Sequence, residues 1–294
     1  MIVRLPKSAQ WRLLQLKLII QSAAARTAMR WRIHRSRRPH NLPGELVVSL
    51  TSYEARFETL PLTLRALLCQ TIKPDRIVLW VSYEDEAKLP KAVTRLKRYG
   101  LDIRVTDDFR SFKKIIPSLK AFPEAFIVTA DDDVYYKQNW LADLASASAG
   151  RRNLIVCHQA RKINIDPYGH LQPYGTWPYI TEPEESSAVF PVGRGGILYP
   201  PSALAREVLN HDAFLELCPK ADDVWLYWMG RNAGSVYRKI GRSEIAWDWP
   251  GTQKVALFRE NLQSNLNDSQ IDAVAKRYGS PVFRGMPRPE DQMR

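Results

Sequence analysis

The chain has 294 residues, of which 45% are hydrophobic and 25% charged, and a formal net charge of +12. Its length suits one large domain or two small ones, and its composition is that of an ordinary globular protein. The sequence contains neither a transmembrane run of ~18 apolar residues nor an evident secretory signal. Three widely separated cysteines, Cys69, Cys157 and Cys218, favour free thiols in a reducing compartment, and no Cys and His spacing indicates zinc.

The positive charge is concentrated at the N-terminus. Residues 1–44 contain ten of the 43 basic residues and no acid, which leaves 33 basic residues against all 31 acidic ones elsewhere. The nearly neutral body argues against a nucleic-acid-binding protein, because such a protein carries cations on its folded surface. The N-terminal segment also contains apolar residues, namely Trp11, Leu13, Leu14, Leu18, Ile19, Ile20, Met29 and Trp31. We expect it to contact an anionic membrane as an amphipathic helix; a disordered basic leader is the alternative.

Beyond Pro43 and Gly44, the pattern predicts strands alternating with helices. Continuous apolar runs predict strands at 45–50, 76–81, 101–106 and 126–130, with further candidates at 153–157, 188–192 and 197–199. Helices are expected over 60–68, 90–99, 222–229 and 269–278. The alternation indicates an α/β fold with a doubly wound sheet.

Three consecutive acids follow the fourth predicted strand. In an extended chain Asp131 and Asp133 would share one side, with Asp132 on the other. Two carboxylates at the carboxyl end of a strand suit a hard divalent cation, Mg²⁺ or Mn²⁺, and open α/β sheets bind ligands at this edge. The sequence therefore predicts a metal site that holds a phosphorylated substrate. A solvated acidic turn or helix start is the alternative.

Further charged residues suit the same chemistry. Lys113 and Lys114 lie between the third and fourth predicted strands and could neutralise a diphosphate; a solvated loop is the alternative. Asp222 and Asp223 open an apolar helix, where burial and mutual repulsion would make one of them a stronger base. We assign Asp223 as general base and Asp222 as helix cap or acceptor contact, although both residues also suit plain helix capping.

An acceptor would need a surface of its own. The turn containing Arg194, Gly195 and Gly196 would let the backbone approach a sugar closely, with Arg194 available for an anionic group. An ordinary glycine-rich turn is the alternative. Aromatic side chains favour sugar faces, and the candidates, each of which also suits the core, are Trp177, Tyr179, Tyr199 and Trp225. His158 and His170 are expected to be structural, and the segment 247–249 is a candidate for closing over the donor.

The order of these elements resembles the GT-A fold of glycosyltransferases, most closely the family-2-like bacterial enzymes. The resemblance spans about residues 45–230 and includes the sequence Ala-Leu-Leu-Cys-Gln-Thr at 66–71 and an Asp-x-Asp motif at a later strand end. It implies a GT-A-type mixed sheet flanked by helices and transfer of a sugar from a nucleotide-sugar, aided by Mg²⁺ or Mn²⁺.

The resemblance also implies roles for individual residues. Asp133 would bind the metal, and Asp131 would face the metal or the donor, with Asp132 also assigned to the donor. The first strand-to-helix loop would touch the nucleotide through Thr51, Ser52, Tyr53 and Arg56, and Asp222 and Asp223 match the acid pair that supplies the base in inverting members. Two departures stand out. The second strand ends in Trp80-Val81-Ser82 without the usual acids, and no Gln-x-x-Arg-Trp signature is present, which argues against a processive synthase.

These observations lead to one principal expectation. Residues 1–44 would be a basic membrane-contacting segment, residues 45–250 a catalytic domain, and residues 251–294 a C-terminal helix and tail. The enzyme would transfer one sugar, with inversion, to a glycan or lipid-linked acceptor in cell-surface polysaccharide or lipopolysaccharide synthesis, as a peripheral protein on the inner face of the cell membrane. A metal-dependent nucleotidyltransferase or phosphoesterase is the alternative.

Overall fold

The structure, a computed structural model, describes residues 7–33, 35, 37–242, 246–250 and 266–281, without the side chains of residues 7–15. Its strands are β1 (Leu46–Thr51), β2 (Arg76–Ser82), β3 (Leu101–Thr106), β4 (Phe126–Ala130), β5 (Val134–Tyr136), β6 (Leu154–Cys157), β7 (Ala160–Lys162), β8 (Glu184–Ser186), β9 (Val189–Pro191), β10 (Ile197–Tyr199), β11 (Val236–Lys239) and β12 (Ala246–Asp248). Its α-helices are α1 (Lys7–Arg32), α2 (Leu60–Leu68), α3 (Tyr83–Glu86), α4 (Lys91–Thr94), α5 (Ile116–Ala121), α6 (Trp140–Ser148), α7 (His211–Leu217), α8 (Asp222–Asn232) and α10 (Leu266–Tyr278). Three short 3₁₀ helices also enter the argument, namely η2 (Arg95–Tyr99), η3 (Arg110–Lys114) and η5 (Gly193–Gly195).

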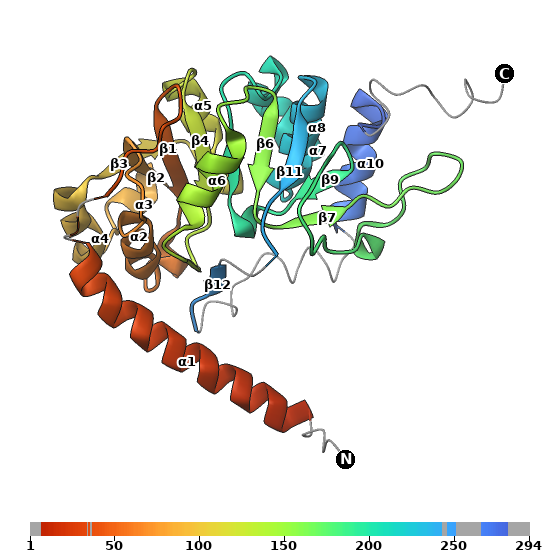
Figure 1. Cartoon of the computed structure of the whole chain (residues 1–294). Coiled ribbons are helices and arrows are strands. Elements are labelled where there is room, and N and C mark those ends of the chain that lie inside the picture. Colours follow the sequence, from red (N-terminus) through yellow and green to blue (C-terminus); the bar gives the residue numbers. More distant parts are fainter. Residues whose placement is uncertain (1–6, 34, 36, 243–245, 251–265, 282–294) are drawn as a thin grey trace, which may run out of the picture.

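A mixed sheet of eight strands, in the order β3-β2-β1-β4-β10-β6-β11-β8, forms the centre of the described chain (Figure 1). β3, β2, β1 and β4 are mutually parallel, whereas β10 runs antiparallel to both β4 and β6. Helices lie against both faces (Figure 1). The expected α/β fold with a mixed, mostly parallel sheet is therefore confirmed.

Alternation along the strands divides the core between the two faces of the sheet. Ile155 and Ile197 pack in the apolar cluster that includes α8, whereas Val156 and Leu198 pack in the cluster that includes α2 and α6. These side chains are at most 1% exposed. Since both faces are covered, the strands read as continuous apolar runs, and this is why their positions were predictable.

Two of the expected helices differ in detail. The helix expected over 90–99 is divided into α4 and η2, and Gly100 ends it with a φ of 98°, in the left-handed region. The helix expected from Ser269 begins earlier, at Leu266, and the Ser269 hydroxyl donates to the Leu266 carbonyl within it. Ser269 is therefore not the helix cap.

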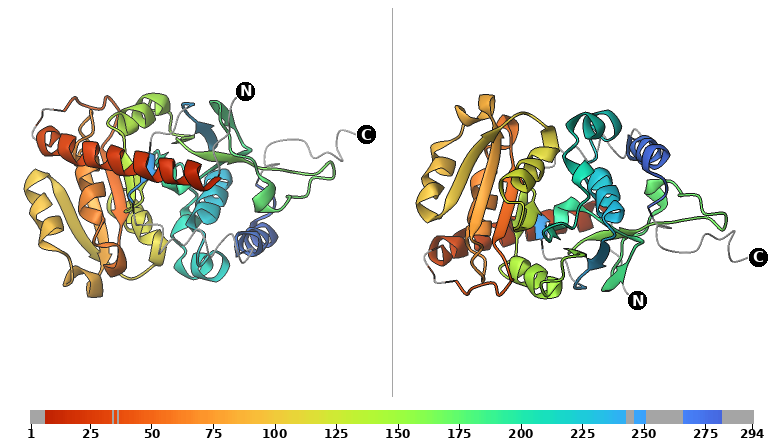
Figure 2. Two further views of the ribbon diagram at one scale, coloured as in Figure 1. Left: turned by 90° about the horizontal axis from the view of Figure 1, so that it is seen from below. Right: turned by 90° about the horizontal axis from the view of Figure 1, so that it is seen from above.

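The helix α1 packs on the body through its C-terminal half. Ala25 and Met29 are buried against Cys69, the C-cap of α2, Tyr135 of β5 and Trp249, which follows β12. Figure 2 (left) shows α1 crossing beneath the sheet, and Figure 1 shows its N-terminal half diverging from the body. None of the helices in the described part of the chain is sufficiently long and apolar to span a bilayer. Because Ala25 and Met29 contact Tyr135 and Trp249, the C-terminal half of α1 lies close to the carboxyl edge of the sheet.

A candidate active site at the carboxyl edge of the sheet

The parallel strands β1 and β4 end side by side, and the segments that follow them meet. The Ser52 hydroxyl donates to an Asp132 oxygen at 2.5 Å. Arg56 donates to the other Asp132 oxygen at 3.2 Å and also pairs with Asp133. The loop after β1 therefore binds the acidic turn after β4 through one hydroxyl and one guanidinium.

Lys114 connects this turn to α8. Its ammonium lies 3.0 Å from an oxygen of Asp131 and 3.0 Å from one of Asp222. The position follows from η3, whose last residue is fixed beneath β1 because the Ser49 hydroxyl donates to the Lys114 carbonyl at 2.6 Å. Burial by itself would lower the pKa of Lys114, but Asp131, Asp222 and Asp223 raise it well above its usual range. Lys114 is therefore a charged, buried link among the aspartates.

Asp223 faces the glycine-rich turn. Its Oδ2 accepts from the Gly193 amide at 2.9 Å, whereas its buried Oδ1 has no hydrogen-bond partner. A Cβ on Gly193 would lie only 2.8 Å from that Oδ1, so the contact requires glycine. Burial and then the charge of Asp222 raise the pKa of Asp223 to about 7. A partly buried carboxylate with one buried, unpartnered oxygen and a raised pKa can accept a proton at neutral pH.

The turn at 193–196 is held by packing. The Gly195 carbonyl accepts from Trp140 at 2.7 Å, and a Cβ on Gly196, where φ is 86°, would lie 2.4 Å from the Trp140 ring. Arg194 donates to Asp248 at 2.7 Å and so connects the turn to β12. The glycines therefore have a structural role in close packing, and Arg194 reaches the edge that carries Asp133.

The pKa values of the three acids in the turn shift in different directions. Although burial opposes it, Lys114 holds the pKa of Asp131 below its usual range. Burial raises the pKa of Asp132 to about 7 against the opposing charge of Arg56, and burial followed by the charge of Asp131 raises that of Asp133. Asp131 pairs with Lys114, whereas Asp132 and Asp133 pair with Arg56. Because residues 131–133 form a turn, Asp132 and Asp133 share Arg56, so the expected alternation of an extended chain was wrong.

The charge of this site favours a divalent cation, but its side chains do not form a complete set of metal ligands in the described residues. The six carboxylates of the site, Asp131, Asp132, Asp133, Asp222, Asp223 and Asp248, face three cations, Arg56, Lys114 and Arg194. An excess of buried negative charge favours binding a cation, and carboxylate oxygens are the ligands that Mg²⁺ and Mn²⁺ prefer. Among the residues that the structure describes, no three acidic, His or Cys side chains converge as a metal-binding group. Asp131 and Asp133 would therefore hold such an ion only together with water and substrate oxygens.

Several expected residues lie elsewhere. Trp225 is fully buried and donates to the Val208 carbonyl, so its assignment to the acceptor was wrong. Lys113 pairs with Asp108 at 2.6 Å, outside the site. Unlike Lys114, it makes no ion pair with the described aspartates of the site, because consecutive side chains of η3 point in different directions. The Thr51 hydroxyl donates to the Trp80 carbonyl of the neighbouring strand.

Some of the remaining expected residues lie at the border of the site or at the surface, and the others pack in the interior. The Tyr53 ring lies 5.8 Å from the Arg56 guanidinium and so borders the site. His158 is buried beside the Trp140 carbonyl, and burial lowers its pKa to about 4, which keeps it neutral. Of the aromatic candidates, Trp177 and Tyr199 are buried, whereas Tyr179 is 46% exposed. Only Tyr179 among them has a ring open to a ligand.

Two residues of the site were not identified from the sequence. Tyr136 accepts from the Asp131 amide at 2.8 Å and donates to the Arg194 carbonyl at 3.3 Å, and so joins both loops. Asp248 lies in β12, which pairs antiparallel with β5 directly after the acidic turn. The Trp-Asp-Trp segment was noted, but pairing between short strands more than 100 residues apart leaves no periodic signal.

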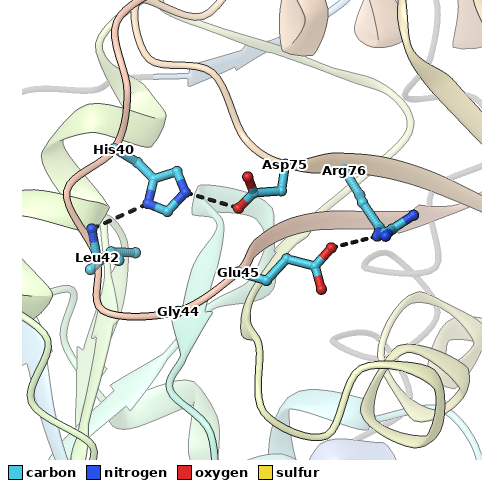
Figure 3. A pocket seen from close by; sticks show the side chains of 6 residues that line it. All are labelled: His40, Leu42, Gly44, Glu45, Asp75 and Arg76. Atoms are coloured by element: carbon cyan, nitrogen blue, oxygen red, sulfur yellow. Dashed lines mark hydrogen bonds and ion pairs between the residues drawn. The ribbon is translucent and has the colours of Figure 1, made fainter.

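A depression also lies at the opposite edge of the sheet. It has a volume of about 610 Å³ and is lined by His40, Leu42, Gly44, Glu45, Asp75 and Arg76 (Figure 3). Its polar groups bind one another, since His40 bonds Asp75 at 2.9 Å and Asp75 accepts from the Leu46 amide at 2.7 Å. This set fixes the linker after α1 to the start of β1 and β2. We assign it a structural role.

Comparisons with known proteins locate the fold. No family model and no curated protein sequence matches the chain. A mannosyltransferase from Pyrobaculum calidifontis, PcManGT, solved with GDP-Man and Mn²⁺, is similar in structure with a TM-score of 0.53 and 16% identity, over 96% of this chain and 81% of that one. GalNAc-T7, solved with UDP, GalNAc and Mn²⁺, is similar over 84% of this chain with a TM-score of 0.45 and 13% identity. The chain spans about half the length of GalNAc-T7 (52%). The similarity to PcManGT shows a GT-A-like fold.

Proposed function

We propose that this protein is a metal-dependent, inverting glycosyltransferase that moves one sugar from a nucleotide-sugar to a glycan or lipid-linked acceptor. The observation that carries the proposal is Asp223, whose Oδ1 is buried without a hydrogen-bond partner and whose charge acts on Lys114, the residue that pairs with Asp131 and Asp222. A base and a cation-binding carboxylate set in one site are the two parts that sugar transfer from a diphosphate requires.

The loop after β1 and the acidic turn form the donor half. Ser52 and Arg56 hold Asp132 and Asp133, so a nucleotide that enters here meets hydroxyl and guanidinium donors. Bound to Asp131 and Asp133, Mg²⁺ or Mn²⁺ would neutralise the departing diphosphate as a Lewis acid. Lys114 adds a fixed positive charge beside Asp131. PcManGT was solved with GDP-Man and Mn²⁺, which supports this half of the proposal.

Asp223 performs the acceptor half. Its Oδ1 takes the proton of the acceptor hydroxyl while that oxygen forms a bond to the anomeric carbon, and the bond from that carbon to the diphosphate breaks. The Gly193 amide fixes the carboxylate by binding Oδ2. Attack from the face opposite the leaving group inverts the anomeric centre.

Nucleoside diphosphates should stabilise the protein only when Mn²⁺ is present. At a ligand concentration about 100 times Kd the stabilisation is about 2.7 kcal/mol, which a thermal-shift screen of UDP, GDP, ADP and CDP detects. We expect the nucleoside diphosphate with one particular base to give the largest stabilisation, and we expect EDTA to abolish it. Asp133→Asn should raise the Kd for that nucleotide at least tenfold. Asp107→Asn, a change at an exposed aspartate outside the site, is the matched control.

Two results would contradict the proposal. Nucleotide-sugar transfer or hydrolysis that survives both EDTA and Asp133→Ala would remove the metal from the reaction. Preferential stabilisation by nucleoside triphosphates would instead favour nucleotidyl transfer, the alternative that uses the same carboxylates.

We further propose that α1 lies on an anionic membrane, on the inner face of the cell membrane. Leu16, Ile20 and Trp31 are 54%, 59% and 76% exposed and fall on one side of the helix, opposite the docked Ala25 and Met29. Exposed Lys17, Arg26 and Arg30 flank that side. An apolar side bordered by cations suits the surface of an anionic bilayer, where a lipid-linked acceptor of cell-surface polysaccharide or lipopolysaccharide would be presented.

Flotation with lipid vesicles tests α1. The full chain should bind vesicles of 30% phosphatidylglycerol in phosphatidylcholine, bind pure phosphatidylcholine poorly, and dissociate at high salt. Ile20→Glu should weaken binding at least tenfold, because it removes apolar burial and adds a like charge to that of the lipid. Thr94→Glu, which adds the same charge at an exposed position on α4, should have no such effect. Equal loss in both variants would show nonspecific attraction and contradict the assignment to α1.

A further inference from the structure

Within the described part of the chain, Arg161 in β7 is a buried cation without a carboxylate partner. The residue is 8% exposed, and no Asp or Glu oxygen of the described chain lies within ion-pair distance of it. Its guanidinium donates to the Trp177 carbonyl at 2.7 Å, and its Nε has no hydrogen-bond partner. Buried charges are normally paired, because removing a charge from water costs several kcal/mol. Arg161 therefore lacks an anion.

Two tyrosine rings border the Arg161 guanidinium. Its centre lies 4.8 Å from the ring centroid of Tyr174 and 4.2 Å from that of Tyr179. Tyr174 is 8% exposed, but Tyr179 is 46% exposed, so Tyr179 forms the outer wall. Cation–π contacts offset part of the cost of burying the charge, and Arg161 also hydrogen-bonds the Tyr174 side chain, so its Nε is the donor left for an oxyanion.

This group lies next to the proposed base. β7 pairs with β9, and two residues after β9 the Gly193 amide binds Asp223. The Asp223 charge also contributes to raising the pKa of Tyr174, after burial as the main cause, so the two side chains are near each other.

A second unpartnered polar group lies between Arg161 and this turn. The buried Gln159 Oε1 has no hydrogen-bond partner, and the Gln159 carbonyl accepts from the Val192 amide at 2.9 Å. A Cβ on Gly195 would lie 2.7 Å from the Gln159 Cβ, so this side chain borders the glycine turn directly. Unpartnered oxygens on Gln159 and Asp223 and an unpartnered nitrogen on Arg161 thus occur along one stretch of the site.

We propose that Arg161, framed by Tyr174 and Tyr179, binds an oxyanion carried by the acceptor, a phosphate or carboxylate group near the hydroxyl that Asp223 deprotonates. The inference rests on the proposed function and names the class of acceptor, an anionic sugar. The guanidinium Nε binds either oxyanion through a charge-assisted hydrogen bond, and the open Tyr179 ring gives the sugar a face on which to stack. The Gln159 amide oxygen accepts from a sugar hydroxyl.

The test uses the full chain and ligand-observed NMR titrations with glucose 1-phosphate, glucuronate, inorganic phosphate and neutral methyl glucoside. We expect glucose 1-phosphate or glucuronate to bind at least tenfold more tightly than methyl glucoside, and their ranking identifies phosphate or carboxylate as the recognised group. Arg161→Gln should weaken the preferred ligand at least tenfold. Tyr179→Ala, at a half-exposed position where folding is not at risk, should weaken it several-fold. Lys162→Gln on the same strand is the matched control and should bind as the wild type does.

The outcomes separate this inference from the proposed function, because binding of nucleoside diphosphate with Mn²⁺ is measured on the same samples. Loss of sugar binding in Arg161→Gln and Tyr179→Ala with nucleotide binding intact supports the anion subsite. Equal binding of charged and neutral sugars, absence of sugar binding, or inorganic phosphate binding that Arg161→Gln leaves unchanged overturns it. A lower melting temperature in Arg161→Gln with wild-type sugar binding by Tyr179→Ala also overturns it, since Arg161 would then only tie β7 to the loop at 174–179.

Discussion

Replacing Lys114 with methionine should destabilise the protein by about 3–5 kcal/mol, the cost of removing one partner from a buried ion pair. The ammonium lies 3.0 Å from both Asp131 and Asp222, and the charge of Asp223 acts on it as well. Without it, Asp131, Asp222 and Asp223 lose the one cation that acts on all three carboxylates in the described structure. Urea unfolding at pH 8, followed by circular dichroism, measures the loss.

The loss should shrink as the pH falls. In the variant Lys114 no longer lowers the pKa values of Asp131 and Asp223, so both rise in the folded state, which then binds more protons than it does in the wild type. Stability then increases as the pH is lowered from 8 toward 5, relative to the wild type. A deficit that is constant with pH would show that Lys114 acts through packing alone.

Lys113→Met provides the matched control. Lys113 is 4% exposed, close to the 7% of Lys114, but its ammonium pairs only with Asp108, whose side chain is 63% exposed. An ion pair with an exposed partner contributes about 0–1 kcal/mol. Equal destabilisation by the two variants would contradict the special position of Lys114.

The contrast between these adjacent lysines shows what a sequence pattern can predict. Continuous apolar runs predicted β1, β2, β4 and β10 because strands covered on both faces carry no other pattern. Consecutive acids at a strand end predicted a cluster of carboxylates at this edge of the sheet, and Asp131, Asp132 and Asp133 lie there with Arg56 and Lys114. Which of Lys113 and Lys114 reaches that turn depends on the 3₁₀ geometry of η3, which composition does not encode.

Residues assembled by tertiary contacts were the hardest to predict. α8 is buried on nearly all sides, so its sequence could not distinguish a core tryptophan from a ligand platform, and Trp225 was assigned to the wrong role. Asp248 reaches the site through a three-residue strand that pairs with β5. Arg161 resembles any surface cation in the sequence, and only its burial without a carboxylate marks it.

Asp223→Asn should lower the kcat of sugar transfer by a factor of about 10²–10⁴, the range that general bases contribute. Asparagine keeps an oxygen for the Gly193 amide, so the turn is retained, but its amide cannot accept the proton of the acceptor hydroxyl. Nucleoside diphosphate binding with Mn²⁺ should remain within about twofold of the wild type. Initial transfer rates and thermal shifts on the same preparation measure both quantities.

The pH dependence identifies which acid acts as the base. Only the ionised carboxylate accepts a proton, and the pKa of Asp223 is raised to about 7, so wild-type kcat/KM should rise about tenfold per pH unit below 7 and level off above it. Burial is the main cause of this raised pKa, and Asp222 is next, whereas Lys114 and the Gly193 amide oppose it.

Asp222→Asn removes the negative charge nearest to Asp223. If Asp223 is the base, this variant keeps substantial activity, and the rising limb of its pH profile moves to lower pH, because the pKa of Asp223 falls. If Asp222 is the base, the variant loses activity across the whole range and Asp223→Asn retains a pH-dependent limb. The pH profiles of the two single variants therefore identify the general base without a structure of the bound substrate. The direction in which the rising limb of the Asp222→Asn profile moves decides between Asp222 and Asp223.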